Sequence, residues 1–473
     1  MGSSIIKYIL LMLILCIAKF SCAQNIFNKA FDEGDISNTT PNALEAFGKY
    51  YFVQKIFKNG NTHLEAVIID TVGAVLLKDE IVTNSTLNIY YGYPGSLQIL
   101  SSQELCQLYH TALDSAVNLI FFDENLNVIR DVQYDFGYFL NAAVIRQIND
   151  STLITLGRIQ NSSTFDLFLI NTDLQGNERW RTIFGEAGKD DYGFAIENIN
   201  NKILVSGNSK DLGPHLYEFN MNGNLTFDTI YSNYDFGICI KYHPLHGLFF
   251  LVDNKITGSS VSNPAILKLN SNYGIEWSKN YFKDEQFVYL QQLTINDFGI
   301  ISLAGGKYVN NEFVGLFFQT NQYGDSLGSK LIDHIPGKRA QFHDIRPTSD
   351  GGYIMAGETH IPSQDSWIVK VNAWGCDNIP CVVGINEQPT TNDGTLNCYP
   401  NPSNGTGVIK GSFKYANYAN EIKIFNSLGQ LVFSKTIVAK EFEMEVNLPS
   451  SGLYLVNLYQ RDMVVKSLKW VVK

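Results

Sequence analysis

The sequence predicts an all-β protein, built from seven repeated sheets and a smaller β-rich tail. Tight-turn residues recur about every fifty residues through most of the chain, each after a short apolar strand. Tyr and Phe are abundant, with 25 and 30 copies, and aromatic residues favour half-buried strands. The composition then changes near residue 385, which separates the tail from the repeats.

The repeat is marked by a glycine or asparagine at the tip of a hairpin. Successive positions are separated by 54, 49, 47, 51, 50 and 51 residues. Both residue types tolerate the positive φ angle of a tight turn. The unit from Leu87 to Asp131 has no turn glycine and is the most divergent copy. The seven expected turn positions are Gly73, Asn127, Gly176, Gly223, Gly274, Gly324 and Gly375.

Each unit offers four short strands. One precedes the turn, as in "NKILVSGNS" and "DGGYIMAGE", and in the second unit we assign it to "GSLQILSS". An inner strand is expected at the recurring pieces "YDFGYF", "DYGFAI" and "YDFGIC". Trp180 and Trp277 follow the turn and predict a fourth strand.

A four-stranded sheet cannot bury both of its faces by itself. Seven sheets stacked around an axis bury them all, which predicts a seven-bladed β-propeller over residues 24–384. The alternative is an open β-solenoid, whose repeats are usually shorter and which needs polar caps at both ends. The last unit lacks a fourth strand. We therefore expect Ile26–Phe31 to complete it beside Ser366–Val371, which favours the ring.

Three stretches, "KDDYGFA", "DGGYIMAGE" and "DSWIVKVN", resemble the repeat propellers of exported proteins from gliding and gingival-type bacteria of the Bacteroidota. The resemblance extends roughly from Gln24 to Val383 and is strongest in the last unit. It implies a propeller that works outside the cytoplasm.

The tail begins after a polar stretch, Ile385–Thr395, which reads as a linker. Residues 396–473 then hold about seven short strands, which predict a small immunoglobulin-like β-sandwich. Within it, Glu421–Phe425 and Gln430–Ser434 are expected to form a hairpin around the turn Ser427–Gly429.

Four tail motifs, "YPNPSNG", "IFNSLGQLV", "LPSSGLYLV" and the terminal "KWVVK", resemble the type A sorting domain of the type IX secretion system of Bacteroidota. The resemblance implies recognition by the outer-membrane export machinery, usually followed by removal of the tail and by release or surface attachment of the cargo. The same residues also suit a purely structural role, in turns and in a small core. The signature positions are Pro400, Asn401, Pro402, Gly429, Gly452 and Tyr454.

The first 23 residues have the features of a signal peptide. Lys7 precedes the apolar run Tyr8–Ala18, which is too short to span a bilayer, and small residues allow cleavage after Ala23. Lipidation of Cys22 is the alternative, although the residues just before it fit that motif poorly. No other apolar run is long enough for a transmembrane helix.

Export makes disulfides admissible. Cys376 and Cys381 lie close enough in sequence to close a small loop, and we predict a disulfide between them. A metal site at this pair would need a second ligand pair, and none is visible. The remaining thiols, Cys106, Cys239 and Cys398, read as single cysteines.

The net charge is -11 and the chain has no basic run, which argues against nucleic acid as a partner. Motifs for a serine nucleophile, a zinc protease or a phosphate-binding loop are missing, so we assign no catalytic residue and expect no cofactor. Calcium at the Asp190–Asp191 loop is a weaker alternative to a solvated turn. His243 and His246 read as surface residues, with a ligand pair as the alternative.

Asp followed by Ser or Thr and then by a small or aliphatic residue occurs five times, where composition predicts about one. The pattern resembles the O-glycosylation acceptor of exported Bacteroidota proteins. Turn chemistry at the start of a strand is the other explanation. The acceptor positions are Thr71, Ser115, Ser151, Thr229 and Ser326.

The function expected from these features is that of a secreted or surface-attached binding or adhesion module. Propellers bind ligands through loops at one end of the central channel. The longer within-unit loops are expected at Thr359–Asp365, Lys255–Pro264 and Lys307–Phe313. Two alternatives stay open: a secreted polysaccharide-degrading enzyme with a propeller catalytic domain, and a structural surface component.

Overall fold

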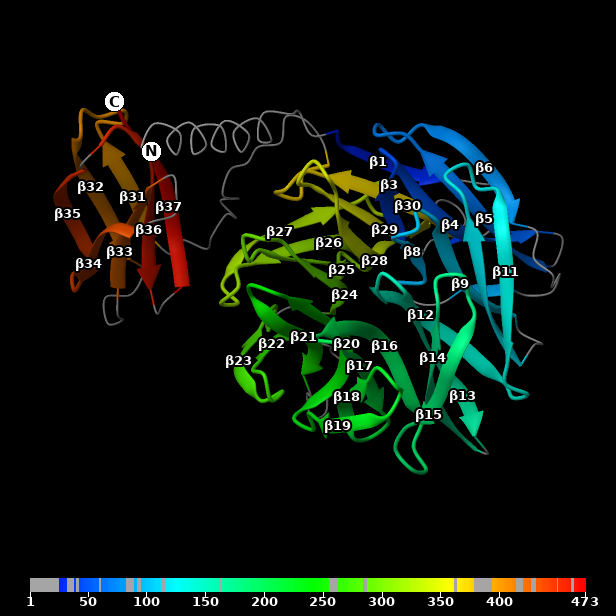
Figure 1. The fold of residues 1–473 in the computed structure, drawn as a ribbon. Coiled ribbons are helices and arrows are strands. Elements are labelled where there is room, and N and C mark those ends of the chain that lie inside the picture. The colour runs from blue at the N-terminus through cyan, green and yellow to red at the C-terminus, as the bar shows by residue number, and fades with distance from the viewer. Residues whose placement is uncertain are drawn as a thin grey trace, which may run out of the picture. The chain divides into compact units, whose positions relative to one another are not determined.

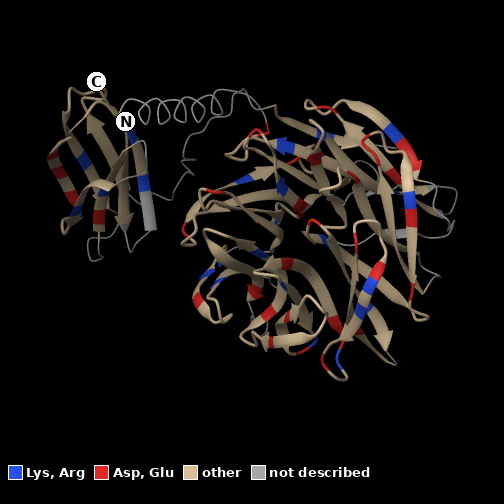
Figure 2. Ribbon diagram, viewed as in Figure 1, with Lys and Arg blue, Asp and Glu red and all other residues tan. Residues whose placement is uncertain are grey.

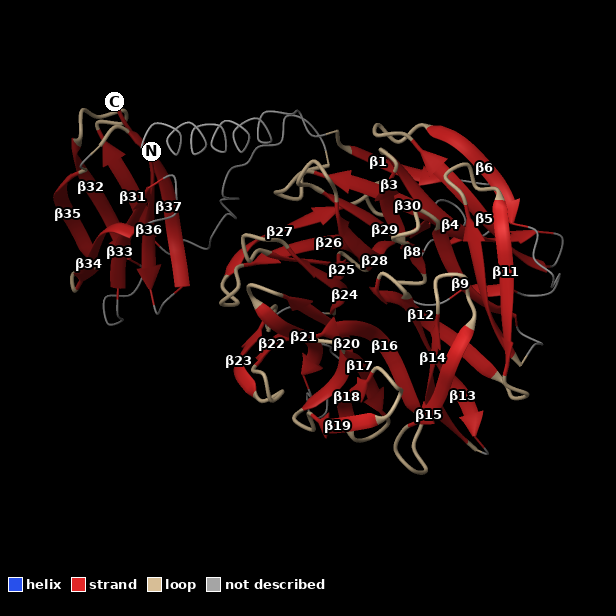
Figure 3. Cartoon of the chain, viewed as in Figure 1, coloured by secondary structure: helices blue, strands red, loops and turns tan. Residues whose placement is uncertain are grey.

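A computed structural model describes residues 25–473 apart from 32–37, 40–41, 59–60, 82–88, 92–94, 112–114, 162, 255–262, 284–286, 361–363, 378–393, 414–419, 427–430, 449 and 461–462. All regular elements in the described residues are strands (Figure 3). The chain divides into two compact units, Met1–Cys381 and Val382–Lys473. The expected signal peptide and most of the expected linker lie outside the described residues.

The described strands of the first unit form seven antiparallel sheets (Figure 1). The first sheet holds β2 (Asn38–Thr39), β3 (Ala43–Ala46), β4 (Lys49–Lys58), β5 (Asn61–Ile69) and β6 (Val75–Ile81). The second holds β7 (Ile89–Tyr91), β8 (Leu97–Ile99), β9 (Leu105–Thr111), β10 (Ala116–Phe122) and β11 (Val128–Asp135). The third holds β12 (Leu140–Asn149), β13 (Thr152–Asn161), β14 (Thr164–Thr172) and β15 (Glu178–Phe184).

The other four sheets have four strands each. The fourth holds β16 (Asp191–Ile199), β17 (Lys202–Ser209), β18 (Gly213–Asn220) and β19 (Leu225–Ile230). The fifth holds β20 (Tyr234–His243), β21 (Gly247–Asn254), β22 (Pro264–Leu269) and β23 (Ile275–Asn280). The sixth holds β24 (Val288–Ile295), β25 (Ile301–Val309), β26 (Glu312–Thr320) and β27 (Ser326–Ile332). The seventh holds β28 (Ala340–Pro347), β29 (Tyr353–His360), β30 (Gln364–Val371) and β1 (Phe27–Phe31).

Each sheet buries its apolar side chains against the next sheet along the chain, and a separate hydrophobic cluster lies at every seam. The last sheet packs on the first in the same way, where Phe27 and Ile368 meet Tyr50 and Phe52. Stacked sheets that return to their starting point form a β-propeller. An open solenoid is excluded, because its terminal sheets would not touch.

Strand β1 closes the ring, as the sequence predicts. It pairs with β30 from Phe27 opposite Lys370 to Phe31 opposite Ser366. Asn28 adds side-chain contacts: its Oδ1 accepts from Nε1 of the buried Trp367 at 2.7 Å, and its Nδ2 donates to the Asp333 carbonyl at 2.8 Å. The pairing converts the outer edge of the seventh sheet into a hydrogen-bonded ladder, so the first and last described strands of this unit are held together.

The turn that follows the third strand repeats the same side-chain device in all seven sheets, and in the first six it leads directly into the fourth strand. An Asp or Asn accepts hydrogen bonds from the backbone N–H groups two and four residues later, which fixes the hairpin. The residue three positions after it takes positive φ. These anchors are Asp70, Asp123, Asp173, Asn220, Asn270, Asn321 and Asn372.

Two expected turn positions were therefore wrong by one residue. In the second sheet the positive φ falls on Leu126 at 64°, and not on Asn127. In the fifth sheet it falls on Tyr273 at 63°, and not on Gly274. The Asx side chain sets the turn position, and its hydrogen bonds outweigh the strain of a non-glycine residue there.

The second sheet also departs from the expected strand order. "GSLQILSS" forms β8, which pairs at the inner edge with β9. Counted from the inner edge, the second strand of this sheet is β9, which the sequence did not indicate.

The expected inner and outer strands were mostly found. "YDFGYF" is divided between the end of β11 and the connection to β12, whereas "DYGFAI" and "YDFGIC" form the inner strands β16 and β20, as predicted. Trp180 and Trp277 lie on the fourth strands β15 and β23, also as predicted.

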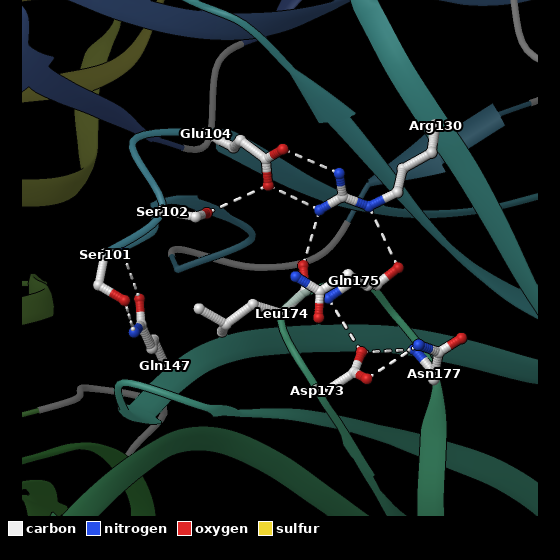
Figure 4. A network of polar contacts seen from close by, with 9 residues as sticks. All are labelled: Ser101, Ser102, Glu104, Arg130, Gln147, Asp173, Leu174, Gln175 and Asn177. Carbon is white, nitrogen blue, oxygen red and sulfur yellow. Dashed lines mark hydrogen bonds and ion pairs between the residues drawn. The ribbon is translucent and has the colours of Figure 1, made fainter.

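Polar side chains tie neighbouring sheets together at their outer edges. Arg130 on β11 makes a double contact with Glu104, at 2.9 and 2.7 Å, and donates to the Leu174 carbonyl at 2.7 Å and to the Gln175 carbonyl at 3.1 Å (Figure 4). The guanidinium also lies 3.8 Å from the centre of the Phe121 ring. Hydrogen bonding to Arg130 lowers the pKa of Glu104, so the pair stays charged and joins the second sheet to the turn of the third.

The second unit consists of two sheets around one core. One holds β31 (Gly394–Tyr399), β32 (Thr406–Phe413) and β35 (Glu441–Asn447), in that order. The other has the order β34 (Leu431–Ile437), β33 (Asn420–Asn426), β36 (Gly452–Gln460) and β37 (Met463–Val472). The expected hairpin corresponds to β33 and β34, while its turn lies outside the described residues. Strand β31 begins at Gly394, inside the stretch expected as linker.

Charged residues of both signs are interspersed along the described strands (Figure 2). Among the described residues, no helix is long and apolar enough to cross a membrane.

Candidate functional site

In each antiparallel sheet of the first unit, successive connections lie alternately at the two ends of the strands. One end carries the connections from the second to the third strand and from each sheet to the next; we call it the connection face. The other end carries the Asx turns and the turns between first and second strands; we call it the turn face. Because the sheets share one strand order, the connections of all seven belong to one face.

Aromatic side chains gather at the connection face of the third, fourth and fifth sheets. Phe139 and Phe165 meet edge to face at 6.1 Å, and Phe194 contacts Phe236 at 4.9 Å between ring centroids. Tyr192 lies parallel to Phe194 at 6.5 Å. Phe139 is 47% exposed, and the other four rings are half-buried. Half-exposed rings in one row offer apolar area at low entropic cost, as ligand sites commonly do.

Arg158 lies within this row. Its guanidinium is 4.6 Å from the Phe165 ring centre and 4.8 Å from that of Tyr192. With the Asn141 amide oriented to satisfy its neighbours, the amide oxygen accepts from Arg158 at 3.2 Å. Arg158, Asn141 and Tyr192 line a small hollow. No carboxylate pairs with Arg158 among the residues that the structure describes.

The electrostatics of the hollow favour an anion. Burial, reinforced by the charge of Arg158, lowers the pKa of His110 to about 4, so this neighbour is neutral at physiological pH. Arg158 is therefore a half-buried cation held by aromatic rings and an amide. A planar guanidinium of this kind binds carboxylate, sulfate or phosphate through two parallel hydrogen bonds.

A second aromatic group lies at the connection face of the sixth sheet. Tyr308 meets Phe287 at 5.9 Å and Phe313 at 5.4 Å, both nearly edge to face. Arg339 lies 5.6 Å from the Phe313 ring centre. The same combination of half-buried ring and guanidinium therefore occurs twice on this face. Sequence reasoning missed both groups, although the aromatic residues at strand ends, such as Tyr192 in "DDYGFA", were a usable signal.

The expected binding loops differ in length from the prediction. Lys307–Phe313 is wrong as a long loop: β25 and β26 continue until only Asn310 and Asn311 remain between them, and both take positive φ in a tight turn. Strands β29 and β30 likewise shorten the loop at Thr359–Asp365 to residues 361–363. Most of Lys255–Pro264 lies outside the described residues.

The two aspartates considered for calcium have protein partners. Asp191 is fully buried, accepts from the Ser209 hydroxyl, and also accepts from the Glu186 backbone N–H at 2.8 Å. Asp190 accepts from the Phe165 backbone N–H at 3.2 Å and lies 3.5 Å from the Lys210 ammonium. Their side chains thus hold the connection between β15 and β16. Calcium binding there stays the alternative prediction.

His243 and His246 stack on each other at 4.7 Å on the turn face. Both rings contact Asp297 through Nε2. That of His243 lies 3.2 Å from the Asp297 carboxylate, and that of His246 lies 3.0 Å from the Asp297 carbonyl. These contacts connect the fifth sheet to the sixth.

Cys376 is part of a disulfide, and its partner lies outside the described residues, as does the predicted partner Cys381. Cys106, Cys239 and Cys398 are free thiols. Burial raises the pKa of Cys239 to about 11 and that of Cys398 to about 12, so neither is a reactive thiolate at neutral pH.

The five expected glycosylation positions all lie on the described surface. Ser151 and Ser326 are exposed, and Thr71, Ser115 and Thr229 are half-buried. Modification at these residues stays a prediction.

A residue of the tail signature, Asn401, holds the last strand of the second unit, β37, through hydrogen bonds. Asn401 donates from Nδ2 to the Lys469 carbonyl at 2.6 Å and accepts from the Val471 N–H at 2.9 Å. Next to it, Ser403 accepts from Nε1 of the buried Trp470 at 3.0 Å and pairs with Val472. The two prolines that flank Asn401, Pro400 and Pro402, follow cis peptide bonds.

A second contact group of the signature surrounds Tyr454. Its ring is buried, and its hydroxyl donates to the Ser450 carbonyl at 2.8 Å. Gly452 follows Ser450 at the start of β36, with a φ of 155°. Gly429 lies outside the described residues.

The seventh sheet contains a buried carboxylate, Glu358 on β29, whose ionisation stabilises the fold. Burial opposes ionisation of Glu358, but contacts from His343 and Gln364 prevail and lower its pKa to about 2. Gln341 also donates to it at 2.9 Å. A depressed pKa adds stability above the unfolded value near 4.5, and that contribution is lost as the pH falls from there towards 2.

We expect the Glu358→Gln variant to lose about 2–3 kcal/mol of stability at pH 7, and its stability to depend less on pH between 4.5 and 2. Urea denaturation midpoints at pH 7, 4.5 and 3 measure both effects. The exposed Glu276 provides the control variant, Glu276→Gln, which should match the wild type. Equal midpoints for wild type and Glu358→Gln at pH 7 would show that the charge contributes nothing.

These observations define a class of protein: an all-β chain with a β-propeller fold, followed by a separate β-rich tail. Residues 397–473 match the family described as "Secretion system C-terminal sorting domain". The chain therefore carries the sorting tail of type IX secretion cargo, which indicates export and a location that is secreted or on the outer surface. No curated protein matches the chain.

Solved structures resemble the chain at low sequence identity. A protein of unknown function from Bacteroides caccae is 12% identical, with a TM-score of 0.37, over 63% of this chain and 94% of its own. The β-propeller domain of the Trilobed protease from Pyrococcus furiosus is 10% identical, with a TM-score of 0.43, over 70% of this chain and 95% of its own. Both TM-scores are low, so the fold class rests on the strand order and the packing between sheets.

Proposed function

We propose that this chain is a binding or adhesion protein, delivered to the outer surface or beyond by the type IX secretion system, whose seven-bladed β-propeller holds an acidic glycan on its connection face. The sorting tail supplies the route. The observation that carries the binding role is Arg158, a cation held between Phe165 and Tyr192 at the mouth of a hollow, with no carboxylate partner among the described residues.

The chemistry of the row suits a sugar polymer. Half-exposed rings pack against the apolar faces of sugar rings, while a guanidinium binds the carboxylate or sulfate that an acidic sugar carries. The second group, around Tyr308 and Arg339, repeats this pairing, so an extended polymer could contact both. The expected gain from two weak contacts on one chain is an increase in effective concentration.

The experiment compares the wild type with Arg158→Met, which keeps a long apolar side chain between the two rings but removes the charge. We expect binding to acidic polysaccharides, measured on a glycan array and by calorimetry, to weaken about tenfold or more, the usual cost of one charge-assisted contact. Neutral polysaccharides should bind both proteins equally.

Arg179 on β15 offers a matched control, because it lies near the turn face of the same sheet, where it donates to Thr152 at 3.1 Å. Arg179→Met should bind as the wild type does. Equal binding by wild type and Arg158→Met would contradict the proposal, as would turnover of the polysaccharide, which would favour a degrading enzyme. Self-association without ligand would favour a structural surface component.

The domain boundaries belong to the same proposal. Residues 1–23 form a signal peptide, 24–384 the propeller, 385–395 a linker and 396–473 an immunoglobulin-like sandwich. Seven sheets with a hydrophobic cluster at each seam support the blade count, and two sheets around one core support the sandwich. Pro400, Asn401, Pro402, Gly429, Gly452 and Tyr454 are the proposed sorting signature.

A further inference from the structure

The seam between the third and fourth sheets holds a cluster that the binding proposal does not use. Glu186 lies in the connection from β15 to β16, His215 lies on β18 and Asp228 on β19. One ligand atom from each lies within 4.8 Å of the others. The His215 ring is fully buried, whereas the Glu186 and Asp228 side chains are 35% and 48% exposed.

Neighbouring residues fix the orientation of the His215 ring. The Ser209 hydroxyl gives its hydrogen to Asp191, so its oxygen is free to accept from Nδ1 of His215 at 3.1 Å. The ring also stacks on Tyr217 at 3.9 Å between centroids. With the Ser209 hydrogen on Asp191, this network assigns the His215 proton to Nδ1 and a lone pair to Nε2.

That lone pair points at two acceptors. Nε2 lies 3.3 Å from the Asp228 carboxylate and 3.9 Å from the Glu186 carboxylate. Neither carboxylate pairs with a Lys or Arg among the described residues; the nearby cations Lys189 and Lys210 pair with Asp211 and Asp190. Three acceptors that converge without a donor repel one another unless a cation lies between them.

The arrangement excludes a nucleophilic Ser-His-Asp triad, although the three residue types are in contact. Ser209 is fully buried and its hydrogen is engaged by Asp191, so its oxygen cannot reach a substrate. We propose instead that Glu186, His215 and Asp228 bind a divalent transition-metal ion, of which Zn²⁺ is the best fit.

The ligand set and its surroundings agree with this assignment. Zn²⁺ takes imidazole nitrogen and carboxylate oxygen at about 2.0–2.2 Å, which places neighbouring tetrahedral ligand atoms roughly 3.3–3.6 Å apart. Ca²⁺ and Mg²⁺ prefer oxygen alone, so a buried imidazole argues against them. A histidine that binds a metal usually donates its other ring N–H to a group that fixes the ring. Here Nδ1 of His215 faces the Ser209 hydroxyl, which Asp191 in turn holds. The exposed carboxylates leave a position open to water.

The test uses the purified, tag-free full chain, stripped with EDTA and titrated with ZnCl₂ by isothermal titration calorimetry. We expect one Zn²⁺ per chain with micromolar or tighter affinity, and a higher melting temperature in excess Zn²⁺. The isosteric substitutions Glu186→Gln and Asp228→Asn, at a half-buried and an exposed position, should each weaken binding at least tenfold. His215→Ala would leave a cavity at a buried position and could unfold the chain, so the proposal is tested with the two carboxylate variants.

Two controls separate this site from adventitious binding. Asp211→Asn removes an exposed carboxylate of the neighbouring loop, and His246→Ala breaks the surface histidine stack; both should bind Zn²⁺ as the wild type does. No binding, binding unchanged in Glu186→Gln and Asp228→Asn, or tighter binding of CaCl₂ than of ZnCl₂ would each overturn the proposal. Loss of Zn²⁺ binding in His246→Ala would move the site to the turn face and overturn it equally.

Discussion

Removal of residues 25–31 is expected to lower the melting temperature of the first unit by roughly 10 °C. The deletion strips the ladder from β30 and removes Phe27, which is 5% exposed and lies in the cluster that joins the seventh sheet to the first. It also leaves Nε1 of the buried Trp367 without its acceptor. Loss of a buried Phe alone lowers the free energy of unfolding by about 3–5 kcal/mol, and each lost hydrogen bond lowers it by about 1 kcal/mol more.

A single substitution tests the same closure with less disruption. Asn28→Ala removes the contacts to Trp367, Asp333 and Asp377 and should cost about 2 kcal/mol, because a buried N–H group is left unsatisfied. The exposed neighbour Lys29 provides the control, Lys29→Ala, which should melt as the wild type does. Differential scanning calorimetry measures all three. An unchanged melting temperature in the deletion variant would mean that β1 does not close the ring.

The second large effect is expected in the tail, for Trp470→Ala. Trp470 is fully buried in the core of the two sheets, and it packs so closely on Gly407 that a Cβ there would come within 2.4 Å of the ring. Truncation of a buried Trp costs about 3–5 kcal/mol, a large share of the stability of a domain of this size. The hydrogen bond from Trp470 Nε1 to the Ser403 hydroxyl is also lost.

Limited proteolysis of the full chain measures this loss, and the fraction of chain found outside cells that carry the type IX system measures its consequence. Because the tail is the sorting domain, Trp470→Ala should be cut faster in the tail and should accumulate inside the cell envelope. Lys469→Ala, at the exposed neighbouring position, should behave as the wild type does. Normal export of a protease-sensitive Trp470→Ala chain would show that sorting does not need the folded core.

Much of the architecture follows from local patterns. The fifty-residue spacing, the Asx and glycine turns and the strands before them depend on residues close in sequence, and their physics acts within one hairpin. The lone first strand beside an incomplete last sheet predicts closure, because an unpaired edge and an unpaired strand need each other. The tail motifs are readable for the same reason, since they set turns and the core of a small domain.

The sequence by itself determined an all-β fold, a repeating sheet, a strand that closes the ring and a sorting tail. The tertiary structure alone decided that β9, rather than the stretch that forms β8, is the second strand of its sheet. It also decided which side chains meet at the connection face, where Arg158 reaches Tyr192 and where His215 reaches Glu186. Residues of different strands and sheets make these contacts, and no local periodicity encodes the distance between them.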